Sequence, residues 1–286
     1  MDDNIAICGG VAYFAEHFAH EKYNSIWKMP SVLLTESLTL ELEGQQQWPD
    51  DVTLYQQDEK YQILPDYANC IAVQTFLKIN NLKFELVAKQ NAEFMSPSGK
   101  LPFIKCGAFV IAEYESILSF VSNKGIGTSQ RMDKAQWADM RAYMSLVNNV
   151  LQNAELYMCW YEKSYYDSVT WYRYSSVFSW PLNYILTWQK KQSVTKKLKV
   201  LGWTKKTKDQ VLEDVKNCCH SLSERLDKNP YFFGEFPTEL DALLYGHMFC
   251  ILTGQPQIQE LGSIIKNFPN LLEMCNRLET NYLMKK

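Results

Sequence analysis

Residues 230–252 (PYFFGEFPTELDALLYGHMFCIL) constrain the fold more than any other part of the chain. Between residues 242 and 252 no side chain carries a fixed charge, and apolar residues fall on every side of a helical wheel. A helix that is apolar all round is a buried one, and at about 14 residues this helix is too short to cross a bilayer. The stretch therefore predicts the central helix of an all-helical domain.

Thr238 and Asp241 predict where that helix begins. Their spacing lets the Thr238 hydroxyl accept from the Asp241 amide while the Asp241 carboxylate accepts from the Thr238 amide, which is a capping box. We therefore expect both residues to be structural. His247 and Cys250 follow inside the helix, and we interpret both as core residues, with His247 satisfied by a hydrogen bond.

Length and composition narrow the class of protein. At 286 residues the chain is long enough for two domains, each with its own core. The formal net charge of −3 excludes a broadly basic nucleic-acid-binding protein. None of the eight cysteines belongs to a C-x-x-C pair, which indicates reduced, buried thiols of a protein that faces the cytosol.

The sequence predicts no membrane-spanning or targeting segment. No apolar run reaches the roughly 18 to 20 residues that a spanning helix needs. The apolar residues 5–15 follow Asp2 and Asp3, whereas a secretory signal needs a positive flank and a mitochondrial presequence needs arginines. We therefore expect any membrane association to be peripheral.

Residues 1–50 are predicted to be an N-terminal extension and linker, with short amphipathic helices near 5–20 and 32–42. This segment also holds Cys8, Glu16, His17 and His20. These four lack a second closely spaced pair of ligands, so we predict no metal site.

The rest of the chain divides into two parts. Residues 51–123 are predicted to alternate as β-α-β-loop-Pro-β-β-α, with strands near 52–56, 84–88, 103–106 and 109–112 and helices near 69–79 and 117–121. The pattern breaks near 125–129, and residues 134–283 are predicted to be helical, with helices near 135–161, 180–201, 210–226, 238–252 and 270–283.

This layout resembles the glutathione transferases, and several stretches are similar to the metaxins in particular. They are TLYQQ at 53–57, NAEFMSPSGKLPFI at 91–104, LVNNVLQNAELY at 146–157, WPLNYIL at 180–186, GWTKKT at 202–207, QVLEDVKNCC at 210–219 and PTELDALLYGH at 237–247. The resemblance implies an α+β fold, with a thioredoxin-like N-terminal domain followed by an all-α glutathione-transferase-type C-terminal domain. It also implies that Pro102 is a structural cis-proline.

Resemblance to the metaxins implies a subunit of the mitochondrial outer-membrane sorting and assembly machinery on the cytosolic face. Its expected partners are another metaxin, the outer-membrane β-barrel insertase and β-barrel precursor proteins. An adaptor that links mitochondria to motor proteins and a glutathione-dependent transferase are the alternatives.

A transferase needs a hydroxyl or thiol near the start of its first helix and a Glu/Gln-Ser pair after its fourth strand. Here Cys70 and Tyr67 are the candidates for the first role, and a thiol at a helix start tends toward a lowered pKa. Alignment on the resemblance puts Glu113 and Tyr114 at the pair, so a bulky ring replaces the serine, and Glu115 with Ser116 is an alternative displaced by two residues. We therefore predict no catalytic residue, no cofactor and no enzyme activity.

Two runs of residues are richer in aromatic or basic side chains than a buried core requires. Twelve Tyr, Trp and Phe residues lie between 157 and 188, Trp171 and Trp180 among them, and such side chains favour protein and membrane interfaces. About half of them are expected in the core. The second run is basic and has no acid before Asp209: Lys190, Lys191, Lys196, Lys197, Lys199, Lys205, Lys206 and Lys208. We interpret both runs as a partner or membrane surface for anionic lipid or an acidic protein rather than nucleic acid, with an ordinary solvated face as the alternative.

Overall fold

The computed structural model describes residues 48–127, 131–254 and 258–284. Residues 48–286 form one compact unit. The helices predicted near 5–20 and 32–42, and the His and Cys residues of that segment, lie outside the described residues. No described helix is both long enough and apolar enough to cross a membrane.

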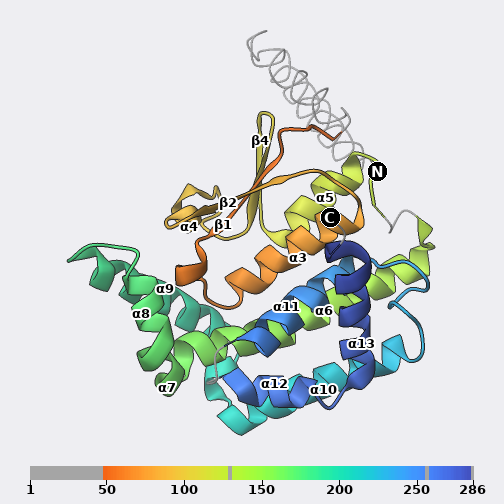
Figure 1. Cartoon of the computed structure of the whole chain (residues 1–286). Coiled ribbons are helices and arrows are strands. Elements are labelled where there is room, and N and C mark those ends of the chain that lie inside the picture. Colours follow the sequence, from red (N-terminus) through yellow and green to blue (C-terminus); the bar gives the residue numbers. More distant parts are fainter. Residues whose placement is uncertain (1–47, 128–130, 255–257, 285–286) are drawn as a thin grey trace, which may run out of the picture. The chain divides into compact units, whose positions relative to one another are not determined.

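A four-stranded sheet begins the described chain (Figure 1). Its strands have the order β2-β1-β3-β4, with β1 and β2 parallel and the other pairs antiparallel. Their bounds are β1 Thr53–Gln57, β2 Glu85–Lys89, β3 Phe103–Cys106 and β4 Phe109–Ala112. The predicted bounds of β3 and β4 are confirmed, and Gly107, at φ 60°, makes the tight turn between them.

Three helices belong to this part: α3 Asp66–Ile79, α4 Ala92–Met95 and α5 Tyr114–Asn123. Figure 1 shows α3 and α5 between the sheet and the helical region. The short α4 was not predicted from the sequence. The Leu101–Pro102 peptide before β3 is cis, and the Pro102 carbonyl accepts a hydrogen bond from the Glu113 amide at 3.0 Å.

Helices make up the remainder, which confirms the predicted fold class. They include α6 Lys134–Leu156, α7 Lys163–Tyr165, α8 Trp171–Ser175, α9 Leu182–Val200, α10 Lys208–Leu226, α11 Glu239–Thr253, α12 Gln259–Ile265 and α13 Pro269–Leu278. The predicted division into domains at 51–123 and 134–283 stays a prediction.

The central helix is α11, as predicted, and every residue from Glu239 to Met248 is buried. Its start is a capping box. The Asp241 carboxylate accepts from the amide and the hydroxyl of Thr238, both at 2.7 Å, and from the amide of Phe232 at 3.1 Å. The bond donated by the Thr238 hydroxyl was not predicted, because this hydroxyl was expected to accept from the Asp241 amide. The bond from Phe232 was not predicted either, and it ties the preceding loop to the helix.

Gly246 allows α11 to lie directly against α3. A Cβ atom at this position would stand 2.4 Å from the carbonyl oxygen of Ala68 and 2.7 Å from the amide nitrogen of Ala72. These are backbone atoms of α3, so a side chain has no room here. The close approach joins the sheet-containing part to the helical part.

The helix predicted over 135–161 ends earlier than expected. After Leu156 the chain widens into a π turn over Tyr157–Tyr161, where the Glu162 amide donates to the Tyr157 carbonyl at 2.8 Å. The Glu162 carboxylate then caps the next short helix by accepting from the Tyr165 amide at 2.8 Å. A local cap thus competes with the continuous helix, which periodicity alone does not reveal.

Candidate functional site

An open cleft of about 580 Å³ lies where the two parts of the fold meet. One wall is formed by residues 98–101 and by the first turns of α3 and α5. The other wall is formed by α6, Trp160 and α9. Clefts between parts of a chain are the usual places for a ligand, so this is the candidate site that the fold provides.

The thiol proposed for this site does not reach it. Cys70 is 2% exposed and packs against the core residues Ala92, Leu101 and Phe103 instead of lining the cleft. Burial raises the pKa of the Cys70 thiol well above its ordinary value. The expectation that a helix start would lower this pKa is therefore wrong, because desolvation outweighs the helix dipole.

Tyr67, the hydroxyl considered beside Cys70, does not line the cleft; with Cys70 it lines a small neighbouring cavity that shares Asp66 and Glu93 with the cleft. Burial raises the pKa of its phenol, and the nearby Cys250 and Glu59 act in the same direction.

Tyr114 occupies the place expected for a small hydroxyl, and its own hydroxyl is already engaged. It is buried and donates to the Glu239 carbonyl oxygen at 2.7 Å, which joins the start of α5 to the start of α11. The preceding residue, Glu113, adopts φ 72° and pairs with Lys100 at 2.7 Å. Positive φ in a residue other than glycine marks a strained position of the kind found at functional sites.

The next residue, Glu115, is also paired within the chain. Its carboxylate accepts from Arg141 at 2.8 Å and from Asn148 at 3.1 Å, both on α6. Acceptor groups at the start of α5 are therefore directed to the protein itself and not to a ligand.

Lys190 of α9 crosses the cleft to the sheet-containing part. Its ammonium contacts Glu93 of α4 at 2.5 Å and Asp66 of α3 at 3.8 Å. The Tyr174 hydroxyl donates to the other oxygen of Glu93 at 3.1 Å. Burial acts to lower the pKa of Lys190, but the two carboxylates outweigh it and the pKa is raised. Lys190 is therefore an internal, charged residue.

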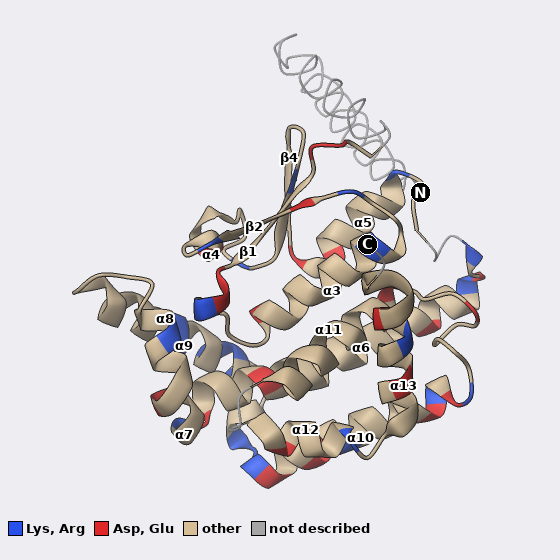
Figure 2. Cartoon of the chain, viewed as in Figure 1, with Lys and Arg blue, Asp and Glu red and all other residues tan. Residues whose placement is uncertain are grey.

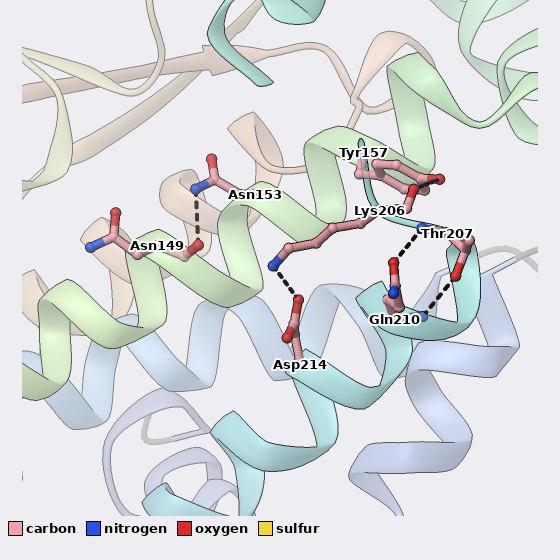
Figure 3. A network of polar contacts seen from close by, with 7 residues as sticks. All are labelled: Asn149, Asn153, Tyr157, Lys206, Thr207, Gln210 and Asp214. Carbon is pink, nitrogen blue, oxygen red and sulfur yellow. Dashed lines mark hydrogen bonds and ion pairs between the residues drawn. The ribbon is translucent and has the colours of Figure 1, made fainter. Parts of the chain in front are cut away.

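The basic run is divided by the fold, and its predicted role as a partner or membrane surface stays a prediction. Lys206 pairs with Asp214, and Lys208 pairs with Glu260 at 2.8 Å. Figure 3 shows the Lys206 side chain pointing to Asp214, while its carbonyl accepts from Tyr157. Lys191 lies 3.4 Å from the centre of the Tyr166 ring. Burial, with Lys100 nearby, lowers the pKa of Lys197, which lines the cleft. Lys196, Lys197, Lys199 and Lys205 are exposed.

The aromatic run is divided as well. Five of its twelve rings are buried and belong to the core: Tyr157, Trp160, Tyr165, Tyr166 and Tyr174. Trp171 is half-buried, with its ring 5.2 Å from that of Tyr172 and 5.7 Å from that of Tyr184. Trp180 and Trp188 are exposed, so the role of this run as a partner or membrane surface stays a prediction for these residues.

Comparison with known proteins decides the family. Residues 70–191 match the family described as outer mitochondrial membrane transport complex protein, and residues 215–278 match the glutathione S-transferase C-terminal domain. Metaxin-2 of Homo sapiens is 48% identical over 251 residues, which cover 87% of this chain and 95% of that protein. The chain belongs to the metaxin family. These matches support a role in mitochondrial protein import.

Other metaxins are also similar to this one. The metaxin-2 homolog of Caenorhabditis elegans is 36% identical and covers 77% of this chain and 95% of its own. Metaxin-1 of Mus musculus is 25% identical and covers 74% of this chain and 69% of its own.

Solved structures confirm the fold of this metaxin. A glutathione transferase family member from Pseudomonas fluorescens pf-5, with two glutathione bound, has a TM-score of 0.54 at 12% identity and covers 82% of this chain and 91% of its own. Glutathione S-transferase III in its apo form has a TM-score of 0.50 at 15% identity, over 81% and 92%. At such identity the likeness concerns the fold alone.

Proposed function

We propose that this metaxin is a non-enzymatic subunit of the mitochondrial outer-membrane sorting and assembly machinery. In this role it helps the import and insertion of β-barrel precursors from the cytosolic face. It acts beside another metaxin and the outer-membrane β-barrel insertase. Residues 70–191 match the family described as outer mitochondrial membrane transport complex protein, and this match supports the role.

One observation carries the non-enzymatic part: charged groups that line the cleft are paired within the protein, one pair across the cleft and one within a single wall. Lys190 binds Glu93, and Lys100 binds Glu113, so the charged groups there are directed to each other. The candidate thiol, Cys70, is protonated and outside the cleft. A thiolate is the reactive form of glutathione and of cysteine, and the raised pKa of Cys70 disfavours one at that position.

Assembly of β-barrel precursors in isolated mitochondria tests the proposal. Mitochondria lacking this metaxin are expected to assemble a radiolabelled β-barrel precursor slowly and to import a matrix-targeted precursor normally. Wild-type protein supplied in the cells is expected to restore assembly. An equal loss of β-barrel assembly and of matrix import, or no loss of either, would contradict the proposal.

A variant with Cys70→Ser and Tyr67→Phe separates assembly from catalysis. Both changes remove a reactive group while keeping most of the side-chain volume, so the fold is retained. We expect this variant to restore assembly as well as the wild type does. If it is folded and still fails, a thiol or phenol is needed and the non-enzymatic proposal is wrong.

A further inference from the structure

Helix α9 has an outward face as well as a buried one. At 3.6 residues per turn, one side of the helix carries Leu182, Ile185, Trp188, Gln192, Lys196 and Lys199, all of them exposed. The opposite side carries Thr187, Val194 and Leu198, which are buried. The outward side is apolar in its first half and basic in its second half.

The apolar half is larger than a solvated helix face requires. Trp188 is 61% exposed, and Trp180, just before the helix, is 79% exposed. Leu182 and Ile185 lie between them and are about half exposed, at 50% and 47%. Figure 1 shows the α8–α9 connection projecting from the body of the molecule beside α4. Leu182 also lines an open hollow of about 510 Å³ with Phe94 and Phe178, so the apolar residues border a hollow on this projecting corner.

The segment that forms this corner carries fixed charge of a single sign. No Asp or Glu occurs between Asp167 and Asp209, and Figure 2 shows the α8–α9 connection without acidic residues. Glu93 of α4, the acid beside this region, is buried and occupied by Lys190 and Tyr174. A solvated face normally mixes both signs of charge.

We propose that the outward face of α9 lies on an anionic lipid surface. Trp180, Leu182, Ile185 and Trp188 enter the headgroup region, and Lys196 and Lys199 contact lipid phosphates. The inference rests on the proposed function, which places this metaxin at the outer membrane.

Two properties of the face favour lipid over a protein partner. Tryptophan has an apolar body and one polar N–H, and it concentrates at the headgroup level of bilayers. Basic residues without acids match the negative surface potential of a leaflet with anionic lipids.

The spacing along α9 sets its orientation on that surface. Ile185 and Lys196 are eleven residues apart, which is about 16 Å along a helix axis. Both contact the surface together only when α9 lies in its plane, as interfacial helices do.

Flotation of the full chain with lipid vesicles tests the inference without any other mitochondrial protein. One set of vesicles is phosphatidylcholine, and the other contains roughly one part in five of phosphatidylinositol, to give a negative surface. We expect the protein to float with the anionic set, less so at raised salt, and its tryptophan emission to be quenched by brominated acyl chains. If the protein floats with neither set of vesicles, the inference is wrong.

Paired variants locate the contact. Trp180→Ser with Trp188→Ser is expected to abolish quenching, whereas Trp137→Ser, which removes a tryptophan 52% exposed on α6, leaves it unchanged. Lys196→Glu with Lys199→Glu is expected to weaken binding to anionic vesicles at least roughly 30-fold, since loss of each lysine near such a surface costs about a factor of five and each new carboxylate adds repulsion. Lys197→Glu, on the cleft side, is the matched control and is expected to have little effect.

Two further results overturn the lipid assignment. In one, Trp137→Ser impairs binding as much as the Trp180→Ser and Trp188→Ser variant does, or Lys197→Glu impairs it as much as the Lys196→Glu and Lys199→Glu variant does. In the other, the α9 variants bind vesicles like the wild type but no longer retain a mitochondrial protein, which makes the face a protein interface. Vesicles contain no assembly machinery, so failure here is distinct from failure of the β-barrel assembly assay.

Discussion

His247 of α11 and Glu155 of α6 form a polar pair that is completely shielded from solvent. His247 Nδ1 lies 2.8 Å from Glu155 Oε1, and both side chains are 0% exposed. The remaining Glu155 Oε2 and His247 Nε2 atoms have no hydrogen-bond partner among the described residues. Burial raises the pKa of Glu155, although His247 acts to lower it. The pair connects the two long central helices.

Removing one member of this pair is expected to be far more harmful than removing both. His247→Ala leaves the Glu155 carboxyl buried without its partner, and such a loss costs about 3–5 kcal/mol of unfolding free energy. Replacing both residues by leucine leaves no buried polar group, and we expect that variant to be clearly more stable than His247→Ala. Urea unfolding of the two variants checks this. Equal stability of the two variants would show that the pair is not the reason for the loss.

Gly246→Ala is expected to destabilise the protein although alanine favours helix. The added Cβ would lie 2.4 Å from the Ala68 carbonyl oxygen, and overpacking of this kind costs typically about 1–3 kcal/mol. Gly262 in α12 is the matched control, because the nearest atom to a Cβ there is 3.8 Å away.

Gly262→Ala is therefore expected to stabilise the protein by up to about 1 kcal/mol, the difference in helix propensity. Thermal unfolding of both variants gives the comparison. If Gly246→Ala is also stabilising, α3 and α11 do not approach as closely as described.

Asp241 is expected to make stability depend on pH in a defined direction. Burial raises its pKa from 3.8 to about 6, although hydrogen bonds from Thr238 and Phe232 act against this. The folded protein then binds this proton more tightly than the unfolded chain. Its contribution to stability is fully present below the unfolded pKa and is lost as pH rises through about 6.

The wild type is therefore expected to exceed Asp241→Asn in stability by the most near the lower end of this window and by less near neutral pH. The asparagine variant is weaker throughout, because its NH₂ group faces either the Thr238 or the Phe232 amide. Thr238→Ala keeps the carboxylate and serves as control: it should cost about 0.5–2 kcal/mol and retain the pH dependence. A wild-type advantage that grows with pH contradicts the direction of the shift.

Features of this metaxin with a local cause were predictable from its sequence. Strand-type residues on either side of Gly107 indicate β3 and β4, and apolar residues on every side of the wheel indicate the buried helix α11. Each pattern is complete within a few residues. The capping residues Thr238 and Asp241 are equally local.

Contacts between distant residues were not predictable in the same way. Lys190 and Glu93 are 97 positions apart, and nothing in either stretch indicates the other. The lysines between 190 and 208 were predicted to form one surface because a sequence does not show toward which side of a helix each side chain points. On α9 successive residues rotate by about 100°, which sends Lys190 and Lys197 toward the cleft and Lys196 outward. Helices as short as α4, α8 and α12 have too few residues to show a period.

Glutathione is expected to bind this metaxin weakly or not at all. Tyr114 fills the place of the small gripping hydroxyl and donates to Glu239, and Glu113 is paired with Lys100. Cys70 is a buried thiol whose pKa is raised by burial, so it does not supply a thiolate or stabilise one. We therefore expect titration calorimetry to give a dissociation constant above about 1 mM, which is weaker than about −4 kcal/mol. The same titration with a glutathione transferase is the positive control.

The variant Lys100→Ala tests whether the Lys100–Glu113 ion pair alone prevents glutathione binding, because it frees Glu113 and leaves Tyr114 in place. Because the Tyr114 ring remains, we expect glutathione to bind this variant as weakly as the wild type. Micromolar binding to Lys100→Ala would show that the internal ion pair, and not the ring, excludes the ligand. Micromolar binding to the wild type, lost in Cys70→Ala with the fold intact, would overturn the non-enzymatic proposal, because it would place a functional thiol where the structure has a core residue.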